Sequence, residues 1–341
     1  MCVKDTGTKY QLWISDFNID GTFVRVHPFI ISHTKTMTRT REDGKEEVFS
    51  ACIKPDDTRY LGGNKNSSVD ATKLQGRPRT GINYDKANEF CANRGDWITM
   101  IDYLEYCALQ ALCYIEYANF DNQAALNTNL TSEGFKQGGL GAGVTNLALD
   151  KWRAFNGGNP IVQTYWTAEH NIGNGSTNGD HYELGNYNTD GSNLSTYPAV
   201  YRGILNFFGD IWTFIRDVVI INRNANYNSV YLLKKDVNHS DVTIDNIQDK
   251  CYFIGDQANT DGVITEFDFR FGPYFVPNKV RTNKKAGYNS RKGSNDESVR
   301  VLLLGSCAFN GSLAKSGSFD SRFVRSNSST GVGFFTTIKL D

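Results

Sequence analysis

Cysteine and histidine side chains are the groups of this chain that could perform covalent chemistry. The seven cysteines contain no Cys-x-x-Cys pair, so their spacing predicts neither a zinc site nor a disulfide framework. A catalytic cysteine needs a neighbouring base that forms its thiolate, and none of the five histidines lies in a recognisable cysteine–histidine motif. We therefore expect buried, free thiols and no catalytic residue.

A second group of residues offers oxygen atoms to a cation. Residues 256–262 read DQANTDG, which combines two carboxylates with amide and hydroxyl oxygens. Their spacing misses the alternating ligand positions of a calcium loop, and a glycine that follows polar residues is typical of a turn. We predict a turn and no cofactor, and a structural Ca²⁺ held by this segment is the alternative.

The C-terminal part of the chain predicts a surface for binding. Residues 301–305 form an apolar run that indicates a buried strand, and residues 331–335 lead into a closing strand. A long segment of small, polar and aromatic residues lies between them. Such a segment, held between two strands, is typical of a binding loop.

Composition describes an ordinary globular chain. With 341 residues, of which 39% are hydrophobic, the chain can bury a sizeable core as one large domain or two smaller ones. The net charge of -1 removes the general attraction to nucleic acid, so we expect no nucleic-acid partner. No apolar run resembles a signal peptide or a membrane span. We therefore expect no membrane insertion and folding in the reducing compartment where the chain is made.

The elements that must position these residues begin with short strands. Residues 11–15, 22–27 and 47–53 are rich in strand-forming side chains. They are separated by the Asp-Gly pairs at residues 20–21 and 43–44, which indicate tight turns. We predict antiparallel strands joined by these turns.

Two helices are predicted next. In the stronger one, apolar residues recur at three- and four-residue steps from Ile101 to Ile115, so we expect a largely buried helix. Asp96 or Thr99 is the expected N-cap. A shorter helix over residues 84–91 precedes it.

Polar segments without periodicity separate these elements. We predict a long loop over residues 54–80 and an ordered insertion with short elements over residues 124–197, which is rich in Gly, Asn, Thr and Ser. Residues 1–79 are expected to be the N-terminal β-rich part of the domain or an attachment region. Residues 80–341 are expected to form the core.

Three segments together resemble one known family. Residues 87–95 (ANEFCANRG) precede a Trp and a helix, residues 201–215 (YRGILNFFGDIWTFI) closely match a "YRGIENPFGNIWEW" signature, and residues 300–306 (RVLLLGS) occupy the place of a "RVLRGGSWNNGSNAG" segment. Residues 116–123 (EYANFDNQ) further resemble a stretch of phage tail proteins. The chain thus resembles the C-type-lectin-fold family of the sulfatase-modifying (formylglycine-generating) enzymes and the phage tropism determinants.

The resemblance implies a fold and a role. The fold is α+β, a C-type lectin fold with antiparallel strands, two helices and long ordered loops. The implied role is a phage tail-tip receptor-binding protein, located in the virion, which recognises a host cell-surface protein or glycan without catalysis. Other tail proteins are the implied partners, and a homotrimer is the implied assembly.

The resemblance also implies where a ligand binds. In variable proteins of diversity-generating retroelements, substitutions concentrate in the segment that corresponds to residues 306–324. We therefore expect residues 304–335 to be a ligand-display segment, with Phe309 as aromatic anchor and Lys315 and Arg322 as polar contacts. The residues predicted to be exposed and to contact the ligand are Cys307, Ala308, Phe309, Ser312, Leu313, Lys315, Ser318, Asp320, Arg322 and Val324.

Two alternatives have the same fold. One is a bacterial surface adhesin anchored through another segment. The other is a sulfatase-modifying-type enzyme that oxidises cysteine, which would need a reactive thiol. Cys307 stands where the family usually has Trp, and the family's catalytic cysteine pattern is not visible. We therefore rank the enzyme below the two binding proteins.

Overall fold

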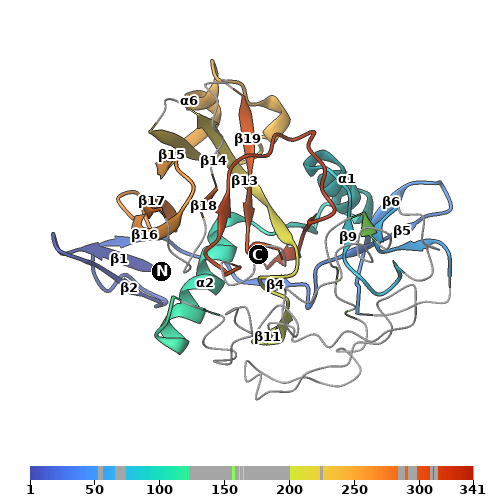
Figure 1. Ribbon diagram of the computed structural model, residues 1–341, viewed down its shortest axis with the longest axis horizontal. Helices are drawn as coiled ribbons and strands as arrows, with labels where there is room; N and C mark the ends of the chain where they lie inside the picture. Colours follow the sequence, from blue (N-terminus) through green and yellow to red (C-terminus); the bar gives the residue numbers. More distant parts are fainter. Residues whose placement is uncertain are drawn as a thin grey trace.

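The computed structural model shows an α+β protein built mainly from antiparallel strands with few helices (Figure 1). The α+β class predicted from the sequence is confirmed. The predicted insertion over 124–197 lies outside the described residues except at four positions. The structure describes residues 1–52, 57–65, 74–120, 122, 156–157, 161, 164, 200–222, 226–282, 289–290, 298–307, 310 and 314–340.

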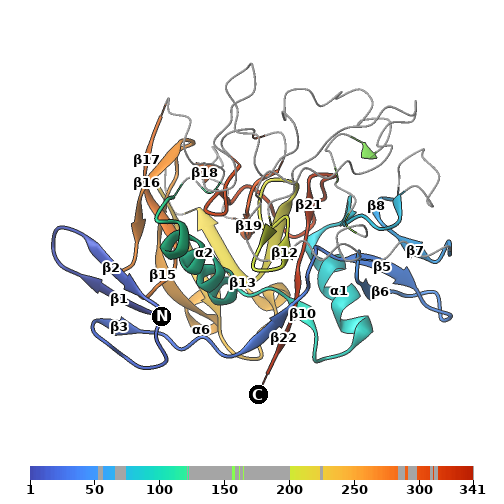
Figure 2. The ribbon, with the colours of Figure 1, turned by 90° about the horizontal axis from the view of Figure 1, so that it is seen from below.

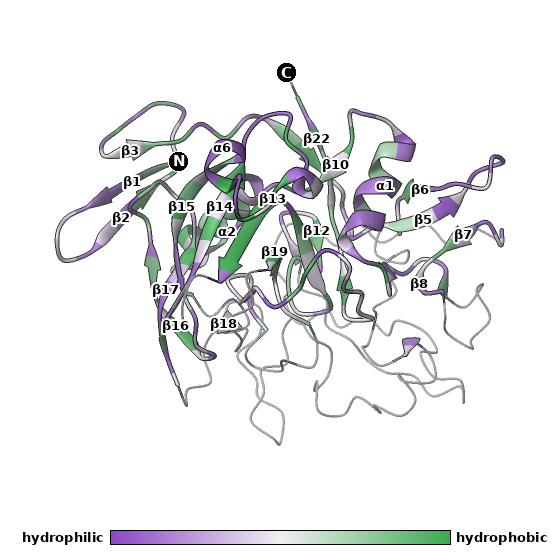
Figure 3. Cartoon of the chain, turned by 90° about the horizontal axis from the view of Figure 1, so that it is seen from above, coloured by the Kyte–Doolittle hydropathy of each residue, from purple (hydrophilic) through white to green (hydrophobic). Residues whose placement is uncertain are grey.

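A mixed sheet occupies the centre of the molecule (Figure 1). Its strands follow the order β15-β14-β13-β19-β20-β18, and β21 pairs with β13. Hydrophobic residues run along β13 (Figure 3). The strands are β13 (Trp212–Asn222), β14 (Tyr227–Leu233), β15 (Cys251–Ala258), β18 (Asn289–Ser290), β19 (Val299–Leu304), β20 (Phe319–Asp320) and β21 (Val332–Gly333).

The two long helices cover opposite faces of this sheet (Figure 2). Successive side chains of a strand point to opposite faces. Accordingly, Leu302 and Leu304 of β19 pack into the cluster of α2 (Tyr103–Tyr117), whereas Val301 and Leu303 pack into the cluster of α1 (Tyr84–Arg94). Burial on both faces explains why residues 301–304 are apolar without alternation.

The N-terminus of α2 differs from the prediction. Asp102, and neither Asp96 nor Thr99, is the N-cap, and the Glu105 carboxylate accepts the Asp102 N–H at 2.9 Å, as in a capping box. Asp102 also pairs with Arg216 of β13 at 2.6 Å. Arg216 of the sheet and the capping box both hold the Asp102 carboxylate at this position. The helix is therefore capped at Asp102 and not at the earlier residues that we predicted.

The rest of the helix prediction is largely confirmed. Most of α2 is buried, but Ile115, which we assigned to the apolar stripe, is 51% exposed. Ile115 belongs to the last turn of the helix, which ends at Tyr117. The shorter helix α1 runs three residues beyond the predicted end, and its Asn83 N-cap side chain accepts the Lys86 N–H at 2.9 Å.

The N-terminal strands form two small sheets, β2-β1-β3 and β6-β5-β7. The Asp-Gly turn at residues 43–44 is confirmed, because Arg41 N–H donates to Lys45 O at 2.8 Å and Gly44 has a φ of 80°. The predicted strand over 22–27 is reduced to two residues. These strands are β1 (Cys2–Asp5), β2 (Tyr10–Trp13), β3 (Thr22–Phe23), β5 (Met37–Thr40), β6 (Glu46–Phe49) and β7 (Tyr60–Leu61).

The long loop predicted over 54–80 is wrong for its described part. This part contains β7, β8 (Gly63–Asn64) and β9 (Arg79–Thr80). Strand β7 pairs with β5, and β8 pairs with β9 in parallel. Two-residue strands carry no periodicity, so the sequence pattern could not reveal them.

The N-terminal third and the C-terminus share a sheet. Strand β22 (Thr336–Lys339) lies between β4 (Phe29–Ile31) and β10 (Thr99–Met100) (Figure 2). A buried ion pair adds a second connection: the Lys35 ammonium lies 2.7 Å from Asp210, and both side chains are at most 1% exposed. Lys35 also donates to Asn206 O at 2.5 Å. The first 35 residues are thereby fixed to the segment that carries the YRG motif.

The YRG motif itself is a tight hairpin. Strands β11 (Val200–Tyr201) and β12 (Ile204–Leu205) pair through a two-residue turn. Arg202 and Gly203 occupy it with φ values of 46° and 77°, as a type I′ turn requires. The Arg202 guanidinium donates to Glu116 at 3.0 Å, so the motif is connected to the end of α2.

All seven cysteines are free thiols, and six of them are buried. The prediction of buried free thiols is confirmed for these six, and Cys52 is half-buried. None of the described helices is long and apolar enough to cross a membrane.

Candidate ligand-binding groove

The C-terminal segment is packed inside the protein to a greater extent than we expected. We predicted Cys307, Lys315, Ser318 and Asp320 to be exposed, and this is wrong, because they are 8%, 3%, 0% and 0% exposed. The reason is strand pairing: Leu303 and Leu304 of β19 pair with Asp320 and Phe319 of β20. The segment therefore adds an inner strand to the sheet.

Contacts with α2 hold the same segment from the other side. The Tyr106 hydroxyl donates to Ser316 O at 3.0 Å. The Ser316 hydroxyl donates to the Asn122 carboxamide at 2.6 Å, and the Asn122 amide lies 3.1 Å from Cys113 Sγ. Buried polar groups are paired in this way along the contact, which fixes the path of residues 314–318.

Of the six remaining predicted contact residues, the structure describes two, Arg322 and Val324. Arg322 is exposed and forms a bidentate pair with Asp320, whose carboxylate lies 2.6 Å away. Val324 is half-buried. The remaining predicted contacts, Ala308, Phe309, Ser312 and Leu313, lie outside the described residues.

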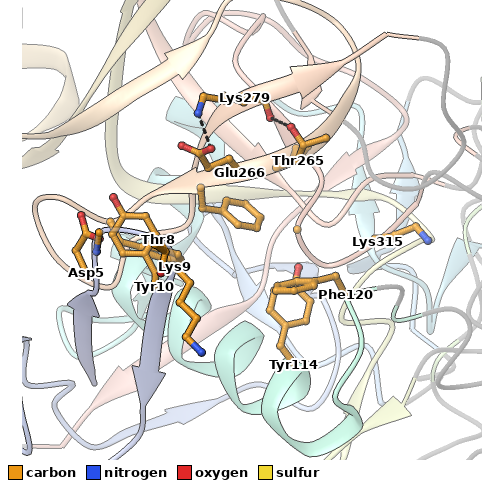
Figure 4. A pocket seen from close by; sticks show the side chains of 15 residues that line it. Asp5, Thr8, Lys9, Tyr10, Tyr114, Phe120, Thr265, Glu266, Lys279 and Lys315 are labelled. Carbon is orange, nitrogen blue, oxygen red and sulfur yellow. Dashed lines mark hydrogen bonds and ion pairs between the residues drawn. The ribbon is translucent and has the colours of Figure 1, made fainter.

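A groove of about 590 Å³ borders the segment at Lys315 and Gly317 (Figure 4). One wall is the turn between β1 and β2 with Tyr10. A second wall is the end of α2 with Tyr114 and Phe120, and the third is the hairpin of β16 (Val263–Asp268) and β17 (Val276–Arg281). The volume lies within the range of about 300–1,000 Å³ that small-ligand sites have.

Aromatic rings form a continuous row along this groove. Tyr10 contacts Phe269 with ring centroids 5.2 Å apart, and Phe269 contacts Phe275 at 5.1 Å. Phe275 contacts Tyr114 at 5.6 Å, and Tyr114 contacts Phe120 at 4.7 Å. All four contacts are edge-to-face, the geometry that aromatic pairs favour. The row ends in Phe120, which is 67% exposed.

Charged side chains of both signs surround the rings. Lys279 of β17 lies 2.6 Å from the Glu266 carboxylate of β16 (Figure 4). Asp5 and Lys9 are exposed on the opposite wall. Lys315 lines the edge, but its ammonium group points away from the rings (Figure 4). The groups that face the groove are therefore balanced in charge.

The tyrosine hydroxyls of the groove stay protonated. Burial raises the pKa of Tyr10 above its ordinary value, and the nearby Asp5 carboxylate raises this pKa further. Burial also raises the pKa of Tyr114. At neutral pH both side chains therefore keep their hydroxyl protons and can donate hydrogen bonds.

The sequence did not reveal this groove. Its residues come from five separate parts of the chain, and only Lys315 among the predicted contacts lines it. Phe120 was the available signal, because a large apolar residue directly after a helix end, within a polar segment, has no helical stripe to join.

Gly317 keeps the segment close to α2. A Cβ atom at this position would lie 2.4 Å from the Tyr114 hydroxyl oxygen, so Gly317→Ala is expected to destabilise the protein by about 1–3 kcal/mol through overpacking. Urea unfolding measures this loss. In a Tyr114→Phe background, which removes the hydroxyl, the same substitution should cost clearly less. Equal costs in the two backgrounds would show that the hydroxyl contact is not the cause.

A second pocket of about 350 Å³ brings Cys91 and His239 together, a pair far apart in the sequence. Burial raises the pKa of the Cys91 thiol to about 12. Burial also lowers the pKa of His239 to about 4. Both groups are therefore neutral at pH 7, and the pair does not provide the thiolate that a nucleophile requires.

The segment considered for Ca²⁺ continues a strand before it turns. Asp256 belongs to β15 and accepts a hydrogen bond from the Ser229 hydroxyl at 3.1 Å, and residues 259–262 connect β15 to β16. The predicted turn is thus shorter than 256–262. Over the described ranges of the chain, no three His, Cys, Asp or Glu side chains are grouped so that they could hold a metal ion.

No protein-family model matches this chain, and no curated protein sequence is significantly similar to it.

Proposed function

We propose that this chain is a receptor-binding protein of a phage tail tip, with a C-type lectin fold, that holds a host-surface ligand without converting it. The aromatic groove beside the C-terminal segment is the observation that carries the binding role. The sequence resemblance of the YRG segment and of residues 300–306 to the family's motifs supports the proposed fold; the first segment forms a hairpin, and most of the second lies in β19.

Two parts of the C-terminal segment have different roles in the proposed function. Residues 314–321 are a rigid wall, because they are fixed between β19 and α2. Arg322 and the exposed residues 326–328 beyond it belong to the outer surface. A wall that is rigid before binding loses little conformational entropy when the ligand arrives.

The buried thiols support a role without catalysis. Burial raises the pKa of Cys113 to about 12 and that of Cys251 to about 11. Burial also raises the pKa of Cys107. These thiols stay protonated at neutral pH and are poor nucleophiles. These three thiols therefore do not supply the reactive thiol that a cysteine-oxidising enzyme would need.

Several copies on one particle would strengthen a modest single-site affinity. In the proposed homotrimer, each further bound copy engages its ligand at a high effective concentration. The proposal therefore requires only weak binding from one groove. Other tail proteins remain the proposed attachment partners within the virion.

Cell staining tests the proposed function. The fluorescently labelled full chain is incubated with a panel of bacterial strains, and saturable binding to a subset of strains is expected. A chain that binds no strain, or all strains equally, contradicts receptor recognition. Immunogold labelling then separates the two binding proteins: gold at phage tail tips supports the phage protein, and gold at the bacterial surface supports the adhesin.

A further inference from the structure

We infer that the aromatic groove binds a short, uncharged saccharide, with Tyr10 and Phe120 as the rings that stack against the faces of the sugar. The inference rests on the proposed receptor-binding function and specifies the ligand class of that site. It is supported by the exposure of the rings, the chemistry of the groove rim and the form of its strand edge.

The two rings lie at the ends of the aromatic row. Phe120 is 67% exposed, and Tyr10 is half-buried against Phe269. Tyr114, which is buried, contacts Phe120, and the half-buried Phe269, which packs on the buried Phe275, contacts Tyr10. A pyranose ring has apolar C–H faces, and exposed aromatic faces at fixed positions offer matching apolar contact.

The rim suits hydroxyl groups. A hydroxyl donates one hydrogen bond and accepts two, so it is served best by neighbouring acceptors and donors together. Asp5 and Glu266 offer acceptor oxygens, whereas Lys9 and Lys279 offer donors. The Glu266–Lys279 pair at 2.6 Å places one charge of each sign side by side on the rim. A strongly anionic or cationic ligand would meet a like charge whichever sign it carried.

The strand edge disfavours an extended peptide. Strand β16 is the edge that lines the groove, and its pairing with β17 is irregular between Ile264 and Glu266 and again between Glu266 and Phe267. Irregular strands interrupt the row of backbone groups that a peptide strand needs for pairing. The Glu266–Lys279 side chains add charges to this edge, which also discourages strand addition.

Treated cells and groove variants test the inference. From the strain panel, the strain that binds the full chain best is treated either with periodate, which cleaves sugar diols, or with protease. Periodate is expected to reduce binding at least tenfold, and protease is expected to leave it unchanged. Phe120→Ala and Tyr10→Ala should each weaken binding about tenfold.

Phe17→Ala is the matched control, because Phe17 is 64% exposed but lies outside the groove. Its binding should equal that of the parent. Circular dichroism checks that each variant is folded, and Phe120→Ala removes a largely exposed ring, so its fold is expected to be intact.

Three other outcomes would each contradict a different claim about the ligand, the groove or the function. Binding that is lost with protease, resists periodate and is unaffected by Phe120→Ala would indicate a protein receptor, which contradicts the saccharide but leaves receptor recognition in place. Periodate-sensitive binding that both groove variants retain would place the saccharide elsewhere and contradict this groove. Binding to no strain would contradict the proposed function itself.

Discussion

Lys35→Met is expected to destabilise the protein by about 3–5 kcal/mol, because it leaves the buried Asp210 carboxylate without its ammonium partner. The two groups lie 2.7 Å apart with almost no solvent exposure. Methionine keeps the apolar stem of the side chain, so the loss reports mainly on charge. Urea unfolding at pH 7 measures it.

Two further variants test whether the loss of stability comes from the buried, unpaired charge. Lys35→Met combined with Asp210→Asn removes the unpaired charge, and it should recover a large part of the loss. Lys86→Met breaks a surface pair with Glu89 in which both side chains are about half exposed, and it should change stability by no more than about 0.5 kcal/mol. Equal losses for Lys35→Met and Lys86→Met would contradict the buried character of the first pair.

His239→Gln is expected to protect the protein against acid. Burial holds the pKa of His239 at about 4 in the folded protein, against 6.5 for an ordinary histidine. Between these two values the unfolded chain takes up a proton that the folded protein refuses, so stability falls as the pH falls. The gap corresponds to about 3 kcal/mol at full protonation of the unfolded state. Glutamine does not titrate and avoids this loss.

The measurement is a double difference of unfolding free energies, for parent and variant, at pH 7 and pH 4.5. The parent should lose about 2–3 kcal/mol more than the variant. Asp217 acts with the opposite sign in the same window, since burial raises its pKa to about 7. Its contribution is present in both proteins and therefore cancels. Parallel pH profiles would show that His239 is not the buried titrating group.

Local signals in the sequence predicted the elements that depend on neighbours in the chain. The Asp-Gly turn at residues 43–44, the apolar strand at 301–304 and the steps along α2 each reflect contacts that repeat within a few residues. These features determine turns, buried strands and helical faces directly.

The candidate site depends on partners that are distant in the sequence. Ser318 and Asp320 resemble loop residues by type, yet both are buried, because Asp320 pairs with Leu303 of β19 and Ser318 O accepts the Gly305 N–H. Asn122 contacts Ser316 across 194 residues, and the groove joins five parts of the chain. Such pairings leave no periodic pattern, so the sequence could not show which side chains of the C-terminal segment are buried.

The position of β22 between β4 and β10 has a consequence for biosynthesis. Ser32 and Thr336 are hydrogen-bonded although 304 residues separate them. While the ribosome is still translating the middle of the chain, β4 and β10 lack the strand that pairs with both of them. Ile30, Ile31 and Met100 stay unpaired until β22 has been synthesised. Contacts of this sequence separation form slowly, and unpaired apolar edges promote aggregation. The yield of native protein should therefore depend on protection of the nascent chain until translation has passed residue 339.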